Sequence, residues 1–484
     1  MRSRLIESAS GHVMVGLLSR LLFVAPARRL LVHLTDLWLK SLLSRGLRSI
    51  PRDRIGVERA HLARAILHTV DRLVSRRALS PRVTRVALGL WAREALSPAA
   101  EQAAARRFRA EHGCAPPWFV VLSPGHACNL RCAGCYANSG PDAVRLHWGM
   151  LDHIIAEARR LWGIPLVVFS GGEPLAYRSE GRDILDVAAS HPDCMYLMFT
   201  NGTLIDEATA LRVAQLGGMT PAISVEGLRD RTDGRRGNGT FDRVLKAMMH
   251  LRRVGVPFGV SVTVTRENCE EVLSDEFLDF FFTEQGAFYG FLFHYMPIGR
   301  GSTLEWMPTP QQRIEFWRRS WDVVASKRIF LFDFWNSGPL VQGCVSAGRE
   351  GGYLYVDWGG RIMPCVFAPY AVASVQDLYA QGKTLNDVWE APFFRAIRQW
   401  QQEYGYGHTE LTKESNWLRP CPIRDHHRLF RQWVEQYKPE PQDEAARQAL
   451  LDDDYYRGLV AYGDTIGACS QPIWESEYVS GERS

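Results

Sequence analysis

Short apolar runs that end in glycine-rich or polar motifs recur through the middle of this chain, and they constrain its fold more than any other feature. Three of them occupy residues 165–170, 195–200 and 220–225. Gly-Gly-Glu-Pro follows the first run, Asn-Gly-Thr the second and Glu-Gly the third, and a stretch of helical character comes after each. This alternation predicts parallel strands joined by crossover helices. Polar groups that follow such strands gather at one end of the sheet.

Three cysteines, Cys128, Cys132 and Cys135, lie in the run Cys-Asn-Leu-Arg-Cys-Ala-Gly-Cys-Tyr, just after a predicted first strand at residues 118–123. This spacing on one loop can hold three irons of a [4Fe–4S] cube and leaves the fourth iron without a protein ligand. A zinc loop needs a second cysteine pair or a well-placed histidine, and His126 is too close to the first cysteine. A disulfide framework is disfavoured, because ten cysteines are spread over 484 residues.

The joint order of these motifs resembles that of the radical S-adenosylmethionine (SAM) enzymes. The resemblance covers about residues 117–300 and includes Ser-Val-Glu-Gly after the fourth strand and Pro-Ile-Gly-Arg-Gly after the sixth. It implies a partial (βα)6 barrel in which SAM, bound at the [4Fe–4S] cluster, is cleaved reductively to a 5′-deoxyadenosyl radical. That radical takes a hydrogen atom from a substrate carbon. The resemblance also implies a reducing partner, such as a flavodoxin or a ferredoxin-like protein.

The same resemblance assigns cofactor-binding roles. Gly171 and Gly172 let the backbone approach the ligand, and Glu173 accepts a hydrogen bond from the SAM ammonium group. An arginine after the fourth strand meets the SAM carboxylate, because its planar fork suits carboxylates. The implied residues are Tyr136, Gly171, Gly172, Glu173, Pro174, Asn201, Ser224, Arg236 (with Arg235 as its alternative) and Gly299.

One position departs from the family pattern. Gly134 stands before the third cysteine, where many members carry an aromatic residue, and Tyr136 follows that cysteine instead. Two interpretations of Tyr136 remain open at this point. Either it packs on the adenine together with the backbone of residues 133–134, or it is an aromatic residue of the core.

A second cysteine set brackets a predicted hairpin, whose strands at residues 353–357 and 361–365 are joined through Trp-Gly-Gly. The pattern C-x15-G-x4-C resembles the extension of SPASM and twitch radical SAM enzymes, which implies an auxiliary [4Fe–4S] cluster held by Cys344, Cys365 and Cys421. Its fourth ligand is open among Asp425, His426, His427 and Cys469, and an iron left free for substrate is a further alternative. The simplest alternative is that these cysteines are buried as small hydrophobes.

Residues 1–112 differ from the rest in charge. They hold 21 Lys and Arg against 8 Asp and Glu, whereas the whole chain has a net charge of +4. An amphipathic helix within residues 13–43 could lie on an anionic membrane, with Leu17, Leu21, Leu22 and Trp38 in the lipid. A helical domain packed on the barrel is an equal alternative. Nucleic acid is disfavoured, because no interleaved aromatics and no recognised motif are present. No run reaches the roughly 20 apolar residues of a membrane span.

The sequence therefore predicts an α/β protein in four parts. They are a basic helical N-terminal region (1–112), a partial radical SAM barrel (113–309), a β-hairpin and helical auxiliary-cluster domain (310–430) and a helical acidic tail (431–484). Iron–sulfur centres require a reducing compartment, so the expected localisation is the cytoplasm, with peripheral contact at the membrane as a further hypothesis.

The expected function is that of a radical SAM enzyme, and the N-terminal pattern suggests a lipid or isoprenoid substrate at a membrane surface. A maturase of a ribosomal peptide or protein side chain is the alternative. A non-catalytic iron–sulfur scaffold or electron-transfer protein would need the cysteines but not Glu173, Ser224 or Arg236. The presence of all these residues favours an enzyme.

Overall fold

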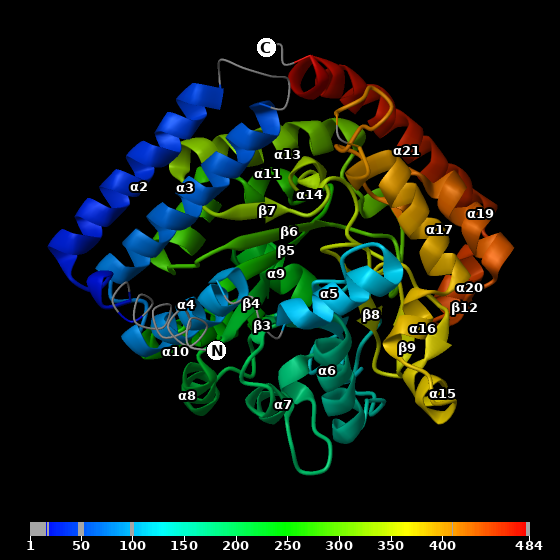
Figure 1. Ribbon diagram of the computed structural model, residues 1–484, viewed down its shortest axis with the longest axis horizontal. Coiled ribbons are helices and arrows are strands. Elements are labelled where there is room, and N and C mark those ends of the chain that lie inside the picture. Colours follow the sequence, from blue (N-terminus) through cyan, green and yellow to red (C-terminus); the bar gives the residue numbers. More distant parts are fainter. Residues whose placement is uncertain (1–15, 17–18, 47–52, 97–100, 409, 481–484) are drawn as a thin grey trace.

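The computed structural model describes residues 16, 19–46, 53–96, 101–408 and 410–480. Its centre is a ten-stranded sheet in the order β11-β9-β8-β1-β2-β3-β4-β5-β6-β7, and β10 pairs with β12 separately (Figure 1). The strands are β1 (Phe119–Leu122), β2 (Leu166–Phe169), β3 (Met195–Thr200), β4 (Met219–Val225), β5 (Gly259–Val264), β6 (Gly290–His294), β7 (Leu331–Asp333), β8 (Tyr353–Val356), β9 (Arg361–Met363), β10 (Tyr370–Ala371), β11 (Ala373–Ser374) and β12 (Glu440–Pro441).

The six predicted barrel strands, of which the fifth and sixth are predicted at residues 257–264 and 288–296, are all present, adjacent in chain order and parallel. Helices connect them, as the alternating pattern predicts, so the expected α/β architecture is confirmed. The helices of this part are α6 (Trp148–Trp162), α7 (Ile184–Ser190), α8 (Glu207–Leu216), α9 (Arg229–Arg236), α10 (Thr240–Val254), α11 (Cys269–Val272), α12 (Asp275–Leu278) and α13 (Pro310–Asp322).

Alternate residues of the strands face two different environments, because successive side chains point to opposite faces of a sheet. Val167, Phe169 and Val260 are fully buried in the large core that includes the helices. Val121 and Val168 instead join a second apolar cluster on the other face. Since both faces are apolar, these strands read as nearly continuous hydrophobic runs in the sequence.

The sheet continues beyond the six barrel strands at both edges. β7 pairs in parallel with β6, and β8 pairs in parallel with β1. The predicted hairpin is formed by β8 and β9, and it extends the barrel sheet instead of standing beside it. Phe119 of β1 stacks on Tyr353 of β8 with ring centroids 4.9 Å apart. This pairing covers a strand edge that would otherwise expose unpaired backbone groups.

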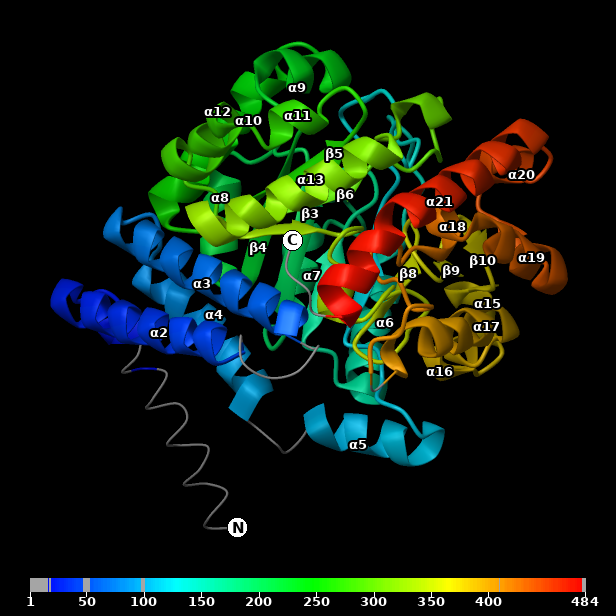
Figure 2. The same ribbon diagram turned by 90° about the horizontal axis from the view of Figure 1, so that it is seen from above.

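Four N-terminal helices precede the barrel: α2 (Ala25–Gly46), α3 (Asp53–Ser75), α4 (Pro81–Leu96) and α5 (Glu101–His112). α4 and α5 pack on the barrel region. Val86 of α4 lies against Gly217, and Phe108 of α5 meets Trp389 edge-on at 5.0 Å. α2 lies outside α3 in both views (Figures 1 and 2). Leu17 and most of residues 1–18 lie outside the described residues.

Helices of the C-terminal part cover the side of the barrel next to β8 (Figure 1). They are α14 (Gly338–Val341), α15 (Val375–Ala380), α16 (Leu385–Trp389), α17 (Pro392–Gln401), α18 (Pro422–Asp425), α19 (His427–Tyr437), α20 (Glu444–Ala449) and α21 (Asp453–Ile473). Within the described parts of the chain, no helix is both long and apolar enough to cross a bilayer.

Candidate active site

Cys128, Cys132 and Cys135 lie on the loop that leaves β1, at the end of the sheet where the parallel strands finish. All three are free thiols and half-buried. Burial raises the pKa of Cys128 to about 11, and the fields of Glu173, Cys132 and Cys135 act in the same direction. The three sulfur atoms therefore lie close enough to influence one another, as the ligands of one cluster must.

Two arginines donate hydrogen bonds to the backbone carbonyl groups of this loop. Arg300 donates through Nη1 to Cys132 O at 2.9 Å, and its backbone N–H donates to Cys135 O at 2.9 Å. Arg235 donates to the carbonyls of Ala133 and Gly134 at 3.1 and 3.2 Å. These fixed cations surround the thiols with positive charge, which suits an anionic iron–sulfur cluster.

Arg236, the predicted partner of the SAM carboxylate, pairs with Glu226 in this structure. Its Nε lies 2.8 Å from Glu226 Oε1, and Arg235 Nη1 forms a second ion pair with the same oxygen at 2.6 Å. Burial acts to lower the pKa of Arg236, but Glu226 and Cys132 outweigh it and the pKa is raised. Arg236 therefore lies near the cysteines and stays charged, while its role toward SAM stays a prediction.

The motifs need glycine because a side chain at these positions would clash with the loop that carries the cysteines. A Cβ on Gly172 would lie 2.2 Å from Ala127 O, and a Cβ on Gly299 would lie 2.3 Å from Cys135 O. Gly171 also has a φ of 102°, which disfavours other residues. The sequence predicts that Gly171 and Gly172 admit the ligand. The structure shows that Gly172 admits the backbone of Ala127 and that Gly171 admits the side chain of Ser123, and their contact with SAM stays a prediction.

Glu173, in the motif after β2, accepts hydrogen bonds from the end of β3 and from the motif that follows it. Its Oε1 accepts from Thr200 Oγ1 at 2.7 Å and from Leu175 N at 3.1 Å, and its Oε2 accepts from Asn201 N at 2.7 Å. Burial raises its pKa. Asn201 in turn donates through Nδ2 to Cys128 Sγ at 3.7 Å, so these two residues also position the cluster loop.

The remaining predicted residues lie around the same end of the sheet. Pro174 begins the short 3₁₀ turn that Glu173 caps. Ser224 lies on β4 directly opposite Ser261 of β5. Their roles toward SAM stay predictions, as do those of Glu173 and Gly299.

Tyr136 is a half-buried residue whose hydroxyl holds the second motif. Its hydroxyl lies 2.6 Å from Ser170 Oγ and accepts from Gly171 N at 3.0 Å, and burial raises its pKa to about 12. Its ring meets Phe367 edge-on, with centroids 5.8 Å apart. This ring contact links Tyr136 to Phe367, whose backbone N–H donates to Cys365 of the second cysteine set. The role of Tyr136 toward the adenine of SAM stays a prediction.

Sequence reasoning missed Trp306. A Cβ on Gly134 would lie 2.5 Å from Trp306 Cζ3 and 3.0 Å from Tyr295 Cε2. Trp306 therefore occupies the space of the aromatic side chain that Gly134 lacks. Nothing in the spacing of residues this far apart in the chain points to the contact.

Comparison with known proteins agrees with this geometry. Residues 122–276 match the model of the radical SAM superfamily. The protein is a radical SAM enzyme. The cofactors of the family are SAM and a [4Fe–4S] cluster, and the free thiols, arginines and glycines around Cys128, Cys132 and Cys135 fit that pair.

Two curated relatives resemble this radical SAM enzyme over more than half of its length. One is the AdoMet-dependent heme synthase of Methanosarcina barkeri (strain Fusaro / DSM 804), 26% identical over 312 residues that cover 58% of this chain and 85% of the relative. The other is the mycofactocin maturase MftC of Mycobacterium ulcerans (strain Agy99), 29% identical over 309 residues that cover 60% of this chain and 79% of the relative.

Two solved structures share the fold. Streptococcus suis SuiB bound to precursor peptide SuiA matches with a TM-score of 0.51 and 16% identity, covering 76% of this chain and 81% of SuiB. Native anSMEcpe with bound AdoMet and Cp18Cys peptide matches with a TM-score of 0.50 and 19% identity, covering 74% of this chain and 99% of anSMEcpe. At these identities the likeness concerns the fold alone.

The second cysteine set of this radical SAM enzyme also converges. Burial raises the pKa values of Cys365 and Cys421 to about 12, and Cys344 acts in the same direction on both. Cys365 Sγ lies 3.1 Å from Tyr353 Oη and accepts from Phe367 N at 3.4 Å. Three free thiols that interact in this way, from three different segments, fit the ligand set of a second cluster.

The candidate fourth ligands are largely engaged elsewhere. Asp425 forms a bidentate pair with Arg313 at 2.6 and 3.1 Å. His426 Nε2 lies 3.0 Å from Arg419 O, and His427 Nδ1 lies 2.7 Å from Ile423 O. Cys469 lies on α21. Within the described residues, no group of three His, Cys, Asp or Glu side chains is arranged to hold a single metal ion.

The C-terminal helices close over the barrel mouth beside the first cysteine set. A narrow pocket there is lined by Tyr136 and Gly299 on the barrel side and by His427, Leu450 and Tyr455 on the other. Residues of the C-terminal helices therefore share a pocket with Tyr136, the residue that directly follows Cys135.

Proposed function

We propose that the protein is a two-cluster radical SAM enzyme. Cys128, Cys132 and Cys135 hold the SAM-binding cluster, and the second cysteine set (Cys344, Cys365 and Cys421) holds an auxiliary one. The supporting observation is that the thiols of each set influence one another and that the Tyr136–Phe367 ring contact links the two sets. When bound, the clusters and SAM supply an electron and the 5′-deoxyadenosyl radical that abstracts hydrogen from a substrate carbon.

The chain's own residues position these groups. Arg235 and Arg300 fix the cluster loop through its carbonyls, and Asn201 donates to one cysteine sulfur. Arg236 and Ser224 are proposed to meet the SAM carboxylate. Because Asp425 is neutralised by Arg313, we propose that the fourth auxiliary iron has no carboxylate ligand and is open to substrate.

The test is anaerobic reconstitution of the wild type and of a Cys128/Cys132/Cys135→Ala variant with iron and sulfide, followed by SAM and dithionite. The wild type is expected to form 5′-deoxyadenosine. The variant is expected to form none and to keep about half the iron. Loss of all iron from the variant would contradict the auxiliary cluster. A fully loaded wild type that never cleaves SAM would contradict the activity.

We propose that the protein acts at a membrane surface, to which the N-terminal helix α2 binds. α2 turns charges toward the protein: Arg28 pairs with Asp71 at 2.7 Å, and Asp36 pairs with Arg64 at 2.8 Å. It turns apolar side chains outward, each between 47% and 60% exposed; they are Leu30, Leu34, Leu37 and Trp38. An apolar stripe on a basic helix is typical of binding to anionic lipid, which would suit a lipid or isoprenoid substrate.

Flotation with vesicles tests this contact. Vesicles that contain an anionic phospholipid are expected to carry the protein at low salt, and a Leu34→Glu/Trp38→Glu variant is expected to stay behind. Leu451→Glu is the matched control, because Leu451 is 73% exposed at the other end of the chain. If the protein does not bind the vesicles but forms dimers that the same variant disrupts, the lipid-binding proposal is contradicted. The apolar face of α2 would then contact a second copy of the chain.

Modification of a ribosomal peptide or protein side chain is the second candidate, and similarity to a maturase over 60% of this chain favours it. The substrate-dependent formation of 5′-deoxyadenosine separates the two candidates. Stimulation by a cell extract that protease treatment abolishes supports a peptide or protein. Stimulation that passes into the organic phase on lipid extraction supports a lipid.

A further inference from the structure

Arg424 is a fully buried cation whose terminal donors have no partner. It lies on α18, three residues after Cys421, and its side chain is 0% exposed. Its Nε donates to Asp425 Oδ1 at 3.2 Å, but neither Nη1 nor Nη2 has a hydrogen-bond partner in the described part of the chain. Such groups are rarely left unsatisfied, because burying them without an acceptor is costly.

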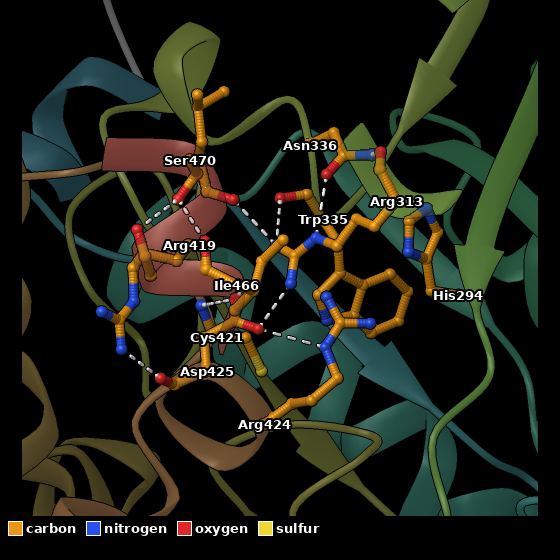
Figure 3. Close-up of polar contacts among 12 residues, drawn as sticks. His294, Arg313, Trp335, Asn336, Arg419, Cys421, Arg424, Asp425, Ile466 and Ser470 are labelled. Atoms are coloured by element: carbon orange, nitrogen blue, oxygen red, sulfur yellow. Dashed lines mark hydrogen bonds and ion pairs between the residues drawn. The ribbon is translucent and has the colours of Figure 1, made fainter. Parts of the chain in front are cut away.

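Arg313, a neighbouring guanidinium buried in the same core, has hydrogen-bond partners for its donors. It makes the bidentate pair with Asp425, and its Nε donates to Asn336 Oδ1 at 3.0 Å (Figure 3). Its Nη2 also donates to Leu418 O at 2.8 Å. Arg313 therefore takes most of the charge of Asp425, and Arg424 shares only one oxygen of it.

The other buried carboxylate nearby, Asp333, serves different donors. It accepts from His294 Nε2 at 3.1 Å and from Asn336 Nδ2 at 2.6 Å. Burial lowers the pKa of His294, and the fields of Arg424 and Arg313 add to this. Aromatic rings cover the flat faces of the Arg424 guanidinium, with Trp335 at 5.0 Å and Tyr462 at 5.6 Å. The terminal edge of the guanidinium, which carries Nη1 and Nη2, therefore remains available to an anion.

Cys421 of the second cysteine set is joined to this guanidinium through one carboxylate. The backbone N–H of Cys421 donates to Asp425 Oδ2 at 3.2 Å, and Arg424 Nε donates to Asp425 Oδ1 at 3.2 Å. Sulfur atoms of an iron–sulfur cluster accept hydrogen bonds, and such bonds and nearby charges set its reduction potential.

We infer that Arg424 donates through Nη1 and Nη2 to the sulfur atoms of the auxiliary cluster and raises its reduction potential. Arg424 is a positioning residue and not an iron ligand. The added electron of the reduced cluster is stabilised by a cation that cannot lose its proton in a site without solvent screening. The inference rests on the proposed auxiliary cluster held by Cys344, Cys365 and Cys421.

The test measures the auxiliary cluster alone, in the Cys128/Cys132/Cys135→Ala parent, by an EPR-monitored redox titration. Arg424→Met is expected to lower the equilibrium constant for one-electron reduction at least tenfold, a shift of about 59 mV to lower potential. Arg428→Met is the matched control, because Arg428 is 62% exposed on α19 and its charge is screened by solvent. It is expected to leave the midpoint unchanged.

Arg424→Gln keeps an amide donor and removes the charge, so it is measured as well in case the Met variant does not hold iron. A midpoint equal to that of the parent in either iron-loaded variant overturns the inference, as does an equal shift in Arg428→Met. If the parent itself binds no iron, the auxiliary cluster is refuted and the inference falls with it. An iron-loaded parent with an unshifted midpoint in Arg424→Gln refutes only the role of Arg424.

Discussion

Tyr136 and Phe367 meet edge-on, with ring centroids 5.8 Å apart and an interplanar angle of 67°. Tyr136 directly follows Cys135, the last cysteine of the first set, and Phe367 donates its backbone N–H to Cys365 of the second. One aromatic pair thus links two cysteine sets that are more than 200 residues apart in the chain. The hydroxyl of Tyr136 also accepts a hydrogen bond from Gly171 N of the second motif.

Tyr136→Phe is expected to destabilise the apoprotein by about 1–3 kcal/mol, because the substitution leaves the N–H of Gly171 without its 3.0 Å acceptor. Thermal unfolding, followed by circular dichroism, measures the change. Tyr437→Phe on α19 is the matched control, because Tyr437 is half-buried like Tyr136 but its hydroxyl makes no hydrogen bond within the described residues, and it is expected to cost less than about 0.5 kcal/mol. Equal melting temperatures for the two variants would contradict the role of the Tyr136 hydroxyl.

Arg300→Met is expected to loosen the cluster loop selectively. It removes the 2.9 Å bond to Cys132 O and the second bond to Ser139 O, and charged hydrogen bonds contribute roughly 1.5–3 kcal/mol each. Iron bound after reconstitution should fall toward the amount that the auxiliary site alone retains. Arg318→Met, on the exposed face of α13, should load as the wild type does. Full loading of both variants would show that the loop does not depend on Arg300.

Gly134→Ala is expected to disturb the cluster loop sterically. The new Cβ would lie 2.5 Å from Trp306, and the φ of 60° at this position adds strain for any residue with a Cβ. We expect a loss of about 1–3 kcal/mol in thermal unfolding, of which Gly134→Ala/Trp306→Leu should recover only the part due to the clash. Gly140→Ala, with nothing within 4 Å of its Cβ, is the control. No recovery in the double variant would argue against the Trp306 contact.

Glu58→Gln is expected to change the pH dependence of stability. Burial raises the pKa of Glu58 from 4.5 to about 7, although Arg54 and Tyr478 oppose the shift. A group with a raised folded-state pKa contributes stability below its unfolded value and loses it as the pH rises to the folded value. Glu58→Gln should therefore gain about 3 kcal/mol relative to the wild type between pH 4.5 and pH 7. Urea unfolding at both pH values measures this, and parallel profiles would rule it out.

Much of the barrel could be predicted from the sequence because its signals are local. Each of β1 to β6 is a short apolar run, and the observed strands begin and end within two residues of the predicted ranges. The cysteine triplet is also local, so its spacing alone predicts a cluster loop. The hairpin can be predicted from Trp-Gly-Gly and the alternating residues around it. Its pairing with β1 cannot be predicted, because a turn sequence does not determine which other strand the hairpin pairs with.

By itself, the sequence determined the α/β class, the parallel strands and the cluster-forming cysteines, since these depend on residue type and on spacings within a few residues. Only the tertiary structure decided that Arg300 holds Cys132 across 168 residues, that Trp306 fills the place left by Gly134, and that Asp425 is occupied by Arg313. These contacts join segments whose separation carries no pattern. They exist because buried charges and carbonyl groups must find partners wherever the folded chain brings them.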